Sequence, residues 1–175
     1  MRRTVAPQRG TQETLGYRGP SACAAAGITY RQLDYWARTG LVEPSLRSAH
    51  SPGTPRLYSF RDVLVLKIVK RLLNAGMSLQ SIRAAVAVLR TEDMAELSRT
   101  TLMSDGAAVY RCASVEEMAE LLRGGRGIFG IAVGAVRAEV ETALAQLQAE
   151  RVEAGKAEPV DHPGDELARR RRRSG

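Results

Sequence analysis

The sequence predicts a mainly α protein: an N-terminal helical module that carries a β-hairpin, followed by a small α/β or α region. Apolar residues recur at helical spacing in several segments, and each segment is bounded by residues typical of helix ends. One Ser-, Pro- and Gly-rich turn separates two β-capable stretches, which predicts the hairpin. Charge divides the chain in the same way. Residues 17–90 contain eleven basic and three acidic residues, whereas residues 91–149 contain five basic and nine acidic residues. This asymmetry indicates that the first part meets a polyanion.

Four helices are expected in the basic part. Proline suits a first helical turn, Ser and Thr cap N-termini, and glycine adopts the left-handed conformation that ends a helix. These signals predict helices over Pro20–Ala26 before Gly27, from Thr29 (a capping box with Gln32) to Gly40, from Ser59 (with Asp62) to Gly76, and from Ser78 onward. Between the second and third helices, the β-capable stretches Val42–Leu46 and Arg56–Tyr58 predict the hairpin.

The acidic part is expected to combine strands and helices. The predicted elements are strands at Thr100–Met103 and Ala108–Cys112, a helix capped by Ser114 and Glu117 that runs to about Leu122, a break or hinge at Gly124–Gly130, and a helix from Ile131 to about Arg151. One side of the last helix carries Val133, Val136, Val140, Leu144 and Leu147. A small domain does not easily bury such a stripe alone, so a second copy of the chain is expected to cover it, which predicts a homodimer.

The two ends are polar and are expected to be disordered, over residues 1–16 and 153–175. The basic run Arg169–Arg173 adds non-specific DNA affinity or is only a solvated tail. No run approaches 18 apolar residues and the start is polar, so a membrane span and a secretory signal are not expected, and the predicted compartment is the cytoplasm.

Chemical function is not indicated by any cluster of residues. Cys23 and Cys112 stand far apart without histidine at ligand spacing, so neither a disulfide nor a metal site is expected, and no cofactor is implied. No nucleophile, base and orienting group come together in the sequence, so an enzyme is not expected.

Helix, turn, helix, hairpin and two further helices form the order of a winged helix-turn-helix. A major groove admits one helix, whose N-terminal side chains reach base edges while basic and hydroxyl groups hold phosphates. On the second helix, Leu33 and Trp36 are expected to pack inward. The groups expected to face DNA are Tyr30, Arg31 and Asp34 from the first turns, Tyr35 and Arg38 along one strip of backbone, and Arg47 and Arg56 at the wing.

Three segments carry a specific resemblance. They are ITYRQLDYWARTGL (28–41), RLYSFRDV (56–63) and GMSLQSI (76–82), in this order and spacing. Residues 17–90 resemble the DNA-binding domain of the MerR family of bacterial transcription regulators, and the segment from Gly16 is similar to an actinobacterial subgroup. The resemblance implies base-edge contact by Arg31 and phosphate contact by Thr29, Tyr35, Arg38 and Arg56. It also implies that Tyr58 braces the wing or touches phosphate.

Two positions depart from the family pattern. Asp34 stands where many members have arginine, and Ala37 stands where many have glutamate. Asp34 either accepts a hydrogen bond from a cytosine amino group or orients Arg31 or Arg38 within the protein. The region after the fourth helix does not resemble that of the family's metal sensors, whose cysteine-rich loop is absent.

The sequence therefore predicts a homodimeric, sequence-specific DNA-binding regulator of transcription. It would read a (pseudo)palindromic promoter site with the helix at 29–39 and the wing at 47–56. Residues 91–152 would dimerise and could take an effector of unknown identity, and RNA polymerase is a further candidate partner. Two alternatives stay open: an excisionase-like architectural protein that bends DNA, and an adaptor whose winged helix docks another protein.

Overall fold

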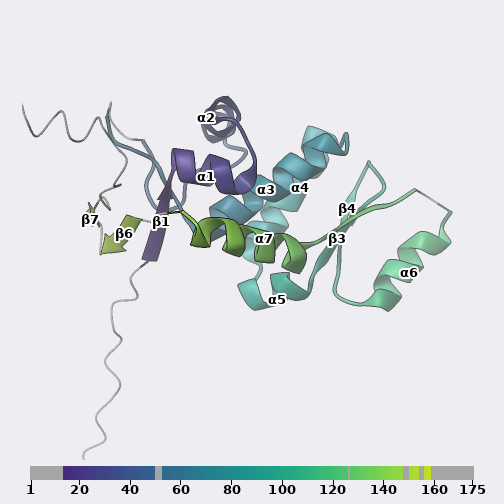
Figure 1. Cartoon of the computed structure of the whole chain (residues 1–175). Coiled ribbons are helices and arrows are strands. Elements are labelled where there is room, and N and C mark those ends of the chain that lie inside the picture. Colours follow the sequence, from purple (N-terminus) through teal and green to yellow (C-terminus); the bar gives the residue numbers. More distant parts are fainter. Residues whose placement is uncertain (1–13, 50–52, 126, 148–149, 154–155, 159–175) are drawn as a thin grey trace, which may run out of the picture.

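The computed structural model describes residues 14–49, 53–125, 127–147, 150–153 and 156–158. Figure 1 shows an elongated molecule in which a group of helices is flanked by a small sheet at either end. The helices are α1 (Gly19–Ala26), α2 (Tyr30–Arg38), α3 (Phe60–Asn74), α4 (Leu79–Thr91), α5 (Met94–Arg99), α6 (Val115–Arg123) and α7 (Val133–Ala145). The strands are β1 (Thr14–Arg18), β2 (Leu57–Tyr58), β3 (Thr101–Ser104), β4 (Val109–Cys112), β5 (Phe129–Ala132), β6 (Glu150–Glu153) and β7 (Lys156–Glu158).

The four helices expected in the basic part are confirmed, and their ends lie where the cap residues predict them. Thr29 and Gln32 form a capping box at the start of α2, and Ser59 and Asp62 form another at the start of α3. Ser78 caps α4 by accepting a hydrogen bond from the backbone amide of Ser81. The chain therefore enters and leaves these helices through local hydrogen bonds that its own sequence supplies.

The hairpin is shorter than the sequence predicts. Val42–Leu46 does not form a strand, which corrects that expectation. Instead, the backbone amides of Leu41 and Val42 donate to the carbonyl of Trp36, and both side chains are buried at the end of α2. Pairing begins only at Arg47, which exchanges two backbone hydrogen bonds of 2.9 and 3.2 Å with Leu57.

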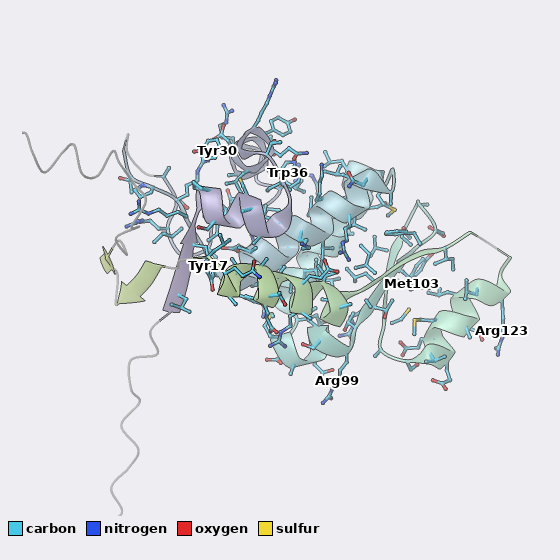
Figure 2. The ribbon with its side chains drawn as sticks, viewed as in Figure 1. Tyr17, Tyr30, Trp36, Arg99, Met103 and Arg123 are labelled. Carbon is cyan, nitrogen blue, oxygen red and sulfur yellow. The ribbon has the colours of Figure 1, made fainter. Side chains whose placement is uncertain are left out.

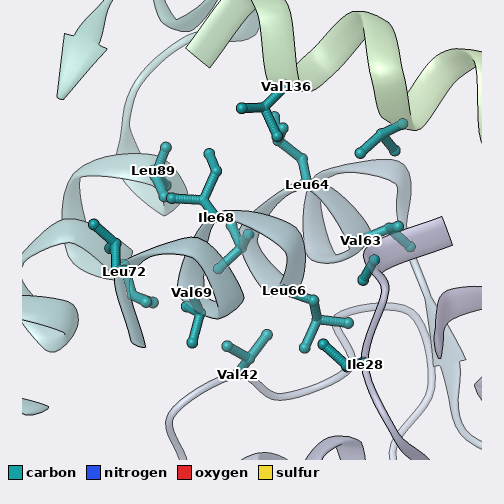
Figure 3. Packing of buried hydrophobic residues seen from close by; sticks show 14 of the residues in the cluster. Ile28, Val42, Val63, Leu64, Leu66, Ile68, Val69, Leu72, Leu89 and Val136 are labelled. Carbon is teal, nitrogen blue, oxygen red and sulfur yellow. The ribbon is translucent and has the colours of Figure 1, made fainter. Parts of the chain in front are cut away.

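Helix α3 is the centre of the core. Most of its residues are buried, because α1, α4 and α7 all pack against it. Figure 3 shows its side chains meeting residues from several directions, among them Val42 before the wing, Leu89 of α4 and Val136 of α7. The two parts of the sequence thus share one continuous apolar core rather than forming separate ones.

Helix α7 corrects the prediction of a long helix with an unpaired stripe. It covers Val133–Ala145, whereas Ile131 lies in β5. Its apolar side is buried inside the same chain, against α1, α3 and the short helix α5, which the sequence did not reveal. Gly134 allows the close approach to α5, because a Cβ there would overlap the carbonyl oxygen of Ser98. A second copy is therefore not needed to cover this stripe.

Two sheets flank the helical core. The order β4-β3-β5 is antiparallel, and its β3–β4 hairpin confirms the two predicted strands to within one residue. The expected break at Gly124–Gly130 is confirmed at its start, because α6 ends at Arg123, but Phe129 and Gly130 belong to β5. The other sheet has the order β2-β1-β6-β7.

The second sheet also corrects the expected extent of the disordered ends. Residues 14–16, 153 and 156–158 lie in strands β1, β6 and β7, because β6 pairs with β1, and Glu150 and Arg151, expected at the end of the long helix, lie in β6 as well. The remaining expectations for residues 1–13 and for the Arg169–Arg173 run lie outside the described residues. None of the helices in the described ranges has the length and apolar character needed to cross a membrane.

Candidate nucleic-acid interface

Helix α2 divides into two sides as the sequence predicts. Leu33 and Trp36 are buried, whereas Tyr30 and Tyr35 are 62% and 61% exposed. The side chain of Arg38 is 69% exposed, and Arg31 is exposed as well. Figure 2 shows α2 at the upper edge of the helical group, with several of its side chains extending away from the body of the molecule. The helix therefore presents two tyrosines and two arginines to solvent from a rigid element.

The start of α2 is held by a complete capping box. Thr29 Oγ1 accepts from the backbone amide of Gln32 at 3.2 Å, and Gln32 Oε1 accepts from the amide of Thr29 at 3.1 Å. This arrangement fixes the first turn, from which Tyr30 and Arg31 project. Thr29 is exposed, but its hydroxyl already serves the cap, because the oxygen accepts from the amide of Gln32 and the hydroxyl donates to Gln32 Oε1 at 3.5 Å.

Asp34 connects α2 to the wing. Its carboxylate is 2.6 Å from Arg38 in the next turn of α2 and 2.8 Å from Arg56 at the end of the wing. The hydrogen bond from Arg56 lowers the pKa of the Asp34 carboxyl, and the charge of Arg38 lowers it further. The carboxylate therefore stays ionised and holds both guanidinium groups on one side of the helix.

These contacts agree with one of the two roles predicted for Asp34. The carboxylate is engaged within the protein, as one alternative expected, and Arg38 is one of the two partners foreseen. Arg56, 22 positions along the chain, is the partner that sequence reasoning missed. No local pattern signals this pair, because it depends on how the wing folds back over α2.

The wing arginines are less free than the sequence suggests. Arg47 donates from Nε to the carbonyl of Pro55 at 3.0 Å, across the two ends of the wing. The side chain of Arg56 is 21% exposed. Both residues reach the surface, but each also fixes the local path of the backbone.

Tyr58 is fully buried, which corrects the prediction that it touches phosphate. It lies on β2 opposite Tyr17 of β1, so its ring packs inside the sheet and core. Burial raises the pKa of its hydroxyl to about 12. The other predicted role, bracing the wing from beneath, agrees with this position.

Asp62 is a positioning residue that the sequence identified only as a helix cap. Its carboxylate is fully buried and accepts from the amides of Ser45 and Ser59, both at 2.8 Å, and from the hydroxyl of Ser45 at 2.7 Å. Arg90 of α4 contacts the same carboxylate at 3.2 Å and also donates to the carbonyl of Glu43. One buried charge thus ties the segment that enters the wing to α3 and α4.

The other predicted features carry no comparable site. Cys112 is buried and Cys23 half-buried, and burial raises the pKa of both thiols. Within the described residues, no three His, Cys, Asp or Glu side chains are grouped so that they could hold a metal ion. The exposed side of α2 with its adjoining wing is the site that the structure brings together.

An exposed helix that follows a short helix, with a helical core beneath it, defines a helix-turn-helix module. Residues 17–88 match the family described as MerR HTH family regulatory protein. A Mycobacterium tuberculosis protein (strain H37Rv) named as an uncharacterized HTH-type transcriptional regulator is 57% identical over 91% of this chain and 70% of its own length. A Mycobacterium bovis protein described in the same words shows the same identity and coverage. The heavy metal-dependent transcription regulator 1 of Rhizobium meliloti is 26% identical over 60% of this chain and 71% of its own length. The chain belongs to the MerR family of transcriptional regulators.

Proposed function

We propose that this regulator is a homodimer that reads a pseudopalindromic promoter site, with α2 in the major groove and residues 47–56 as a wing on the flanking backbone. The observation that carries the proposal is the exposed side of α2, which presents two tyrosines and two arginines beside a wing of matching charge. A helix of this kind fits a major groove, and guanidinium and phenol groups are suited to phosphate oxygens. Such a regulator acts in the cytoplasm, where bacterial DNA lies.

The residues have separate roles in this proposal. Arg31 points outward from the first turn and reads a base edge, because arginine donates two parallel hydrogen bonds to guanine. Tyr35 and Arg38 hold phosphates along one DNA strand. Tyr30 and Thr29, at the start of α2, contact the DNA backbone. Arg47 and Arg56 contribute positive charge at the wing.

Asp34 sets the geometry of the phosphate-binding arginines. A guanidinium has five N–H donors in a fixed plane, so a group that gives one or two to a carboxylate keeps others for a phosphate oxygen. Asp34 therefore orients Arg38 and Arg56 before DNA arrives. Since Arg38 is far more exposed than Arg56, Arg38 carries the greater share of direct phosphate contact and Arg56 mainly positions the wing.

The C-terminal part supports the reading module in two ways. Helix α7 completes the core beneath α1 and α3, and Glu139 of α7 pairs with Arg71 at 2.6 Å and with Lys67 at 3.6 Å. The remaining α6 and β3–β5 form a projection that is free to contact a second copy, an effector or RNA polymerase.

The test is selection of bound sites from random duplexes with the full chain, followed by titration of the selected site at several salt concentrations. We expect a pseudopalindromic consensus, and a logarithmic affinity that falls with a slope of about −0.9 per phosphate neutralised. Selection without any consensus, but with salt-dependent binding and bending, would favour the architectural alternative. Absent or salt-insensitive binding would favour the adaptor and overturn the proposal.

A further inference from the structure

An open groove lies where the reading module meets the C-terminal part. Its volume is about 480 Å³, which falls in the range of small-molecule sites in proteins. The last turn of α3 contributes Arg71 and Asn74 to its lining, β5 contributes Phe129, and the first turn of α7 contributes Ala135. Residues that are far apart in the sequence therefore line one hollow.

The polar side chains of the groove keep hydrogen-bond donors to spare. Nη2 of Arg71 donates to both carboxylate oxygens of Glu139, at 2.7 and 2.6 Å. Among the described residues, Nε and Nη1 of Arg71 have no hydrogen-bond partner, and neither has the exposed carboxamide of Asn74. Most N–H donors of this guanidinium thus remain for another acceptor.

The electrostatic surroundings of the groove favour an anion. The described lining residues include no aspartate or glutamate. Glu139 lies beside Arg71, but it also pairs with Lys67 at 3.6 Å, so two cations share one carboxylate and a positive charge remains. Helix α7 also begins at this groove, and no side chain caps its first turn, so the positive end of the helix dipole lies there.

The rest of the lining is apolar. Phe129 is 39% exposed on β5, an edge strand of its sheet, and its neighbours Ala75, Ala132 and Ala135 are small. An exposed phenyl ring offers a surface on which another ring can stack. The groove thus combines an aromatic wall with a cationic end.

We propose that this groove binds a small organic anion with a flat aromatic body. Its acidic group contacts Arg71 and Asn74, and its ring lies against Phe129. A carboxylate suits the paired N–H donors of a guanidinium, and the carboxamide adds a further donor. An inorganic anion leaves the aromatic wall uncovered, and a neutral aromatic compound leaves the cation without an acceptor. The binding itself depends neither on the proposed homodimer nor on DNA.

The first experiment is isothermal titration calorimetry on the full chain without DNA. The probe is naphthoate, its neutral counterpart is naphthamide, and N-acetylaspartate represents an acidic side chain of a protein partner. Naphthoate is expected to bind about tenfold or more tightly than naphthamide, because only the anion pairs with the guanidinium. Equal affinities, or no binding of naphthoate at millimolar concentration, would overturn the proposal. Tighter binding of N-acetylaspartate than of naphthoate would assign the groove to an acidic protein partner instead.

Two substitutions separate the halves of the site. Arg71→Gln is expected to weaken naphthoate about tenfold and to leave naphthamide unchanged, whereas Phe129→Ala should weaken both. Arg137→Gln is the matched control, because Arg137 is 36% exposed against 37% for Arg71 and also pairs with a glutamate of α7, Glu141, outside the groove. Circular dichroism checks that each variant is folded. If Arg71→Gln and Arg137→Gln have the same effect on naphthoate, Arg71 does not contact the anion.

Glu139→Gln tests the site in the opposite direction. It removes the carboxylate that competes for Arg71, so naphthoate should bind severalfold more tightly. A purely structural role of the ion pair predicts the reverse, because the same change removes a contact between α3 and α7. Glu141→Gln removes the other ion pair of α7 and should leave the affinity unchanged. Weaker binding by Glu139→Gln would contradict the anion site.

The position of the groove also gives its occupant a role in regulation, which rests on the proposed function. The occupant touches α3 of the reading module together with β5 and α7 of the C-terminal part. Saturating naphthoate is therefore expected to change the affinity for the selected DNA site about fivefold or more in the wild type, but not in Arg71→Gln. An unchanged affinity would overturn the effector role and leave the ligand site standing. A chain that binds naphthoate but no DNA would overturn the proposed function alone.

Discussion

Asp34 and Arg56 join the reading helix to the wing through a hydrogen-bonded ion pair of 2.8 Å. The same carboxylate holds Arg38 on the outer side of α2. Two cations that would repel each other are thus kept side by side next to one anion, in the surface that we propose for DNA. A residue whose charge opposes DNA is therefore part of the arrangement that we propose to bind it.

The Asp34 contact is expected to persist over the whole physiological pH range. Because hydrogen bonding to Arg56 lowers the pKa of Asp34 in the folded state, its stabilising effect is present above the ordinary aspartate value and is lost as pH falls through the lower folded value. The carboxyl should therefore titrate below 3.8, the ordinary value. A ¹³C NMR titration of the side-chain carboxyls measures this, and titration above that value would contradict the pair.

Asp34→Asn is expected to loosen sequence preference while strengthening binding to random DNA. The change removes one negative charge beside the phosphates, but it also releases Arg38 and Arg56 from a fixed geometry. Fluorescence anisotropy with the selected site and a scrambled duplex measures both effects. Glu141→Gln is the control, because Glu141 holds Arg137 on α7 in a similar ion pair away from α2. An unchanged ratio of the two affinities would show that the pair has no role in recognition.

Arg31→Ala is expected to reduce the preference for the selected site by about 1–3 kcal/mol, at the base pair that this side chain reads. The measurement compares affinities for the selected site and for single-base variants of it. Arg99→Ala serves as a control, because Arg99 is an exposed arginine on α5, on the side of the molecule opposite α2 in Figure 2. If the wild-type ranking of sites survives in Arg31→Ala, the assignment of α2 to the groove is wrong.

Arg38→Ala should instead weaken all duplexes by a similar factor. The loss of one phosphate contact is expected to reduce the salt slope by about 1. Titrations of the selected and scrambled duplexes at several salt concentrations give this slope. A loss confined to the selected site would place Arg38 on a base rather than on the backbone.

Asp62→Ala is expected to destabilise the protein by about 3 kcal/mol, because it leaves Arg90 and the amides of Ser45 and Ser59 without their shared acceptor. Urea unfolding at neutral pH measures the free energy of unfolding. Asp62→Asn keeps one acceptor oxygen and should lose less. Equal stability of Asp62→Ala and the wild type would exclude Asp62 as the tie between wing and core.

Local signals predicted the reading module well. The caps at Thr29, Ser59 and Ser78 and the division of α2 into a Trp36 side and a Tyr35 side depend on neighbouring residues, so the sequence alone reveals them. The exposed candidates on α2 follow from the same helical period.

What the sequence did not reveal depends on contacts between distant segments. Asp34 and Arg56 meet only when the wing folds over α2. Tyr58 lies in the sequence at the end of the wing, but β2 pairs with β1 there, opposite Tyr17, and the side chain of Tyr58 is buried. The short helix α5 lacks a full apolar period, so the sequence did not predict it, and the apolar stripe of α7 therefore had no predicted partner in its own chain.

Removal of everything after Arg90 would uncover the side of α3 that α7 covers, so tests of subunit association need the full chain.

The packing of α7 on α1 and α3 limits how the two parts of this regulator can communicate. Residues from both share one apolar cluster, and the ion pairs of Glu139 with Arg71 and Lys67 fasten its edge. Within the described residues, the reading module and the C-terminal part are therefore joined by packed side chains rather than by a linker alone. An event at the projecting sheet would reach α2 as a small sliding of packed helices, carried by α7 and α1, rather than as a swing of one domain against another.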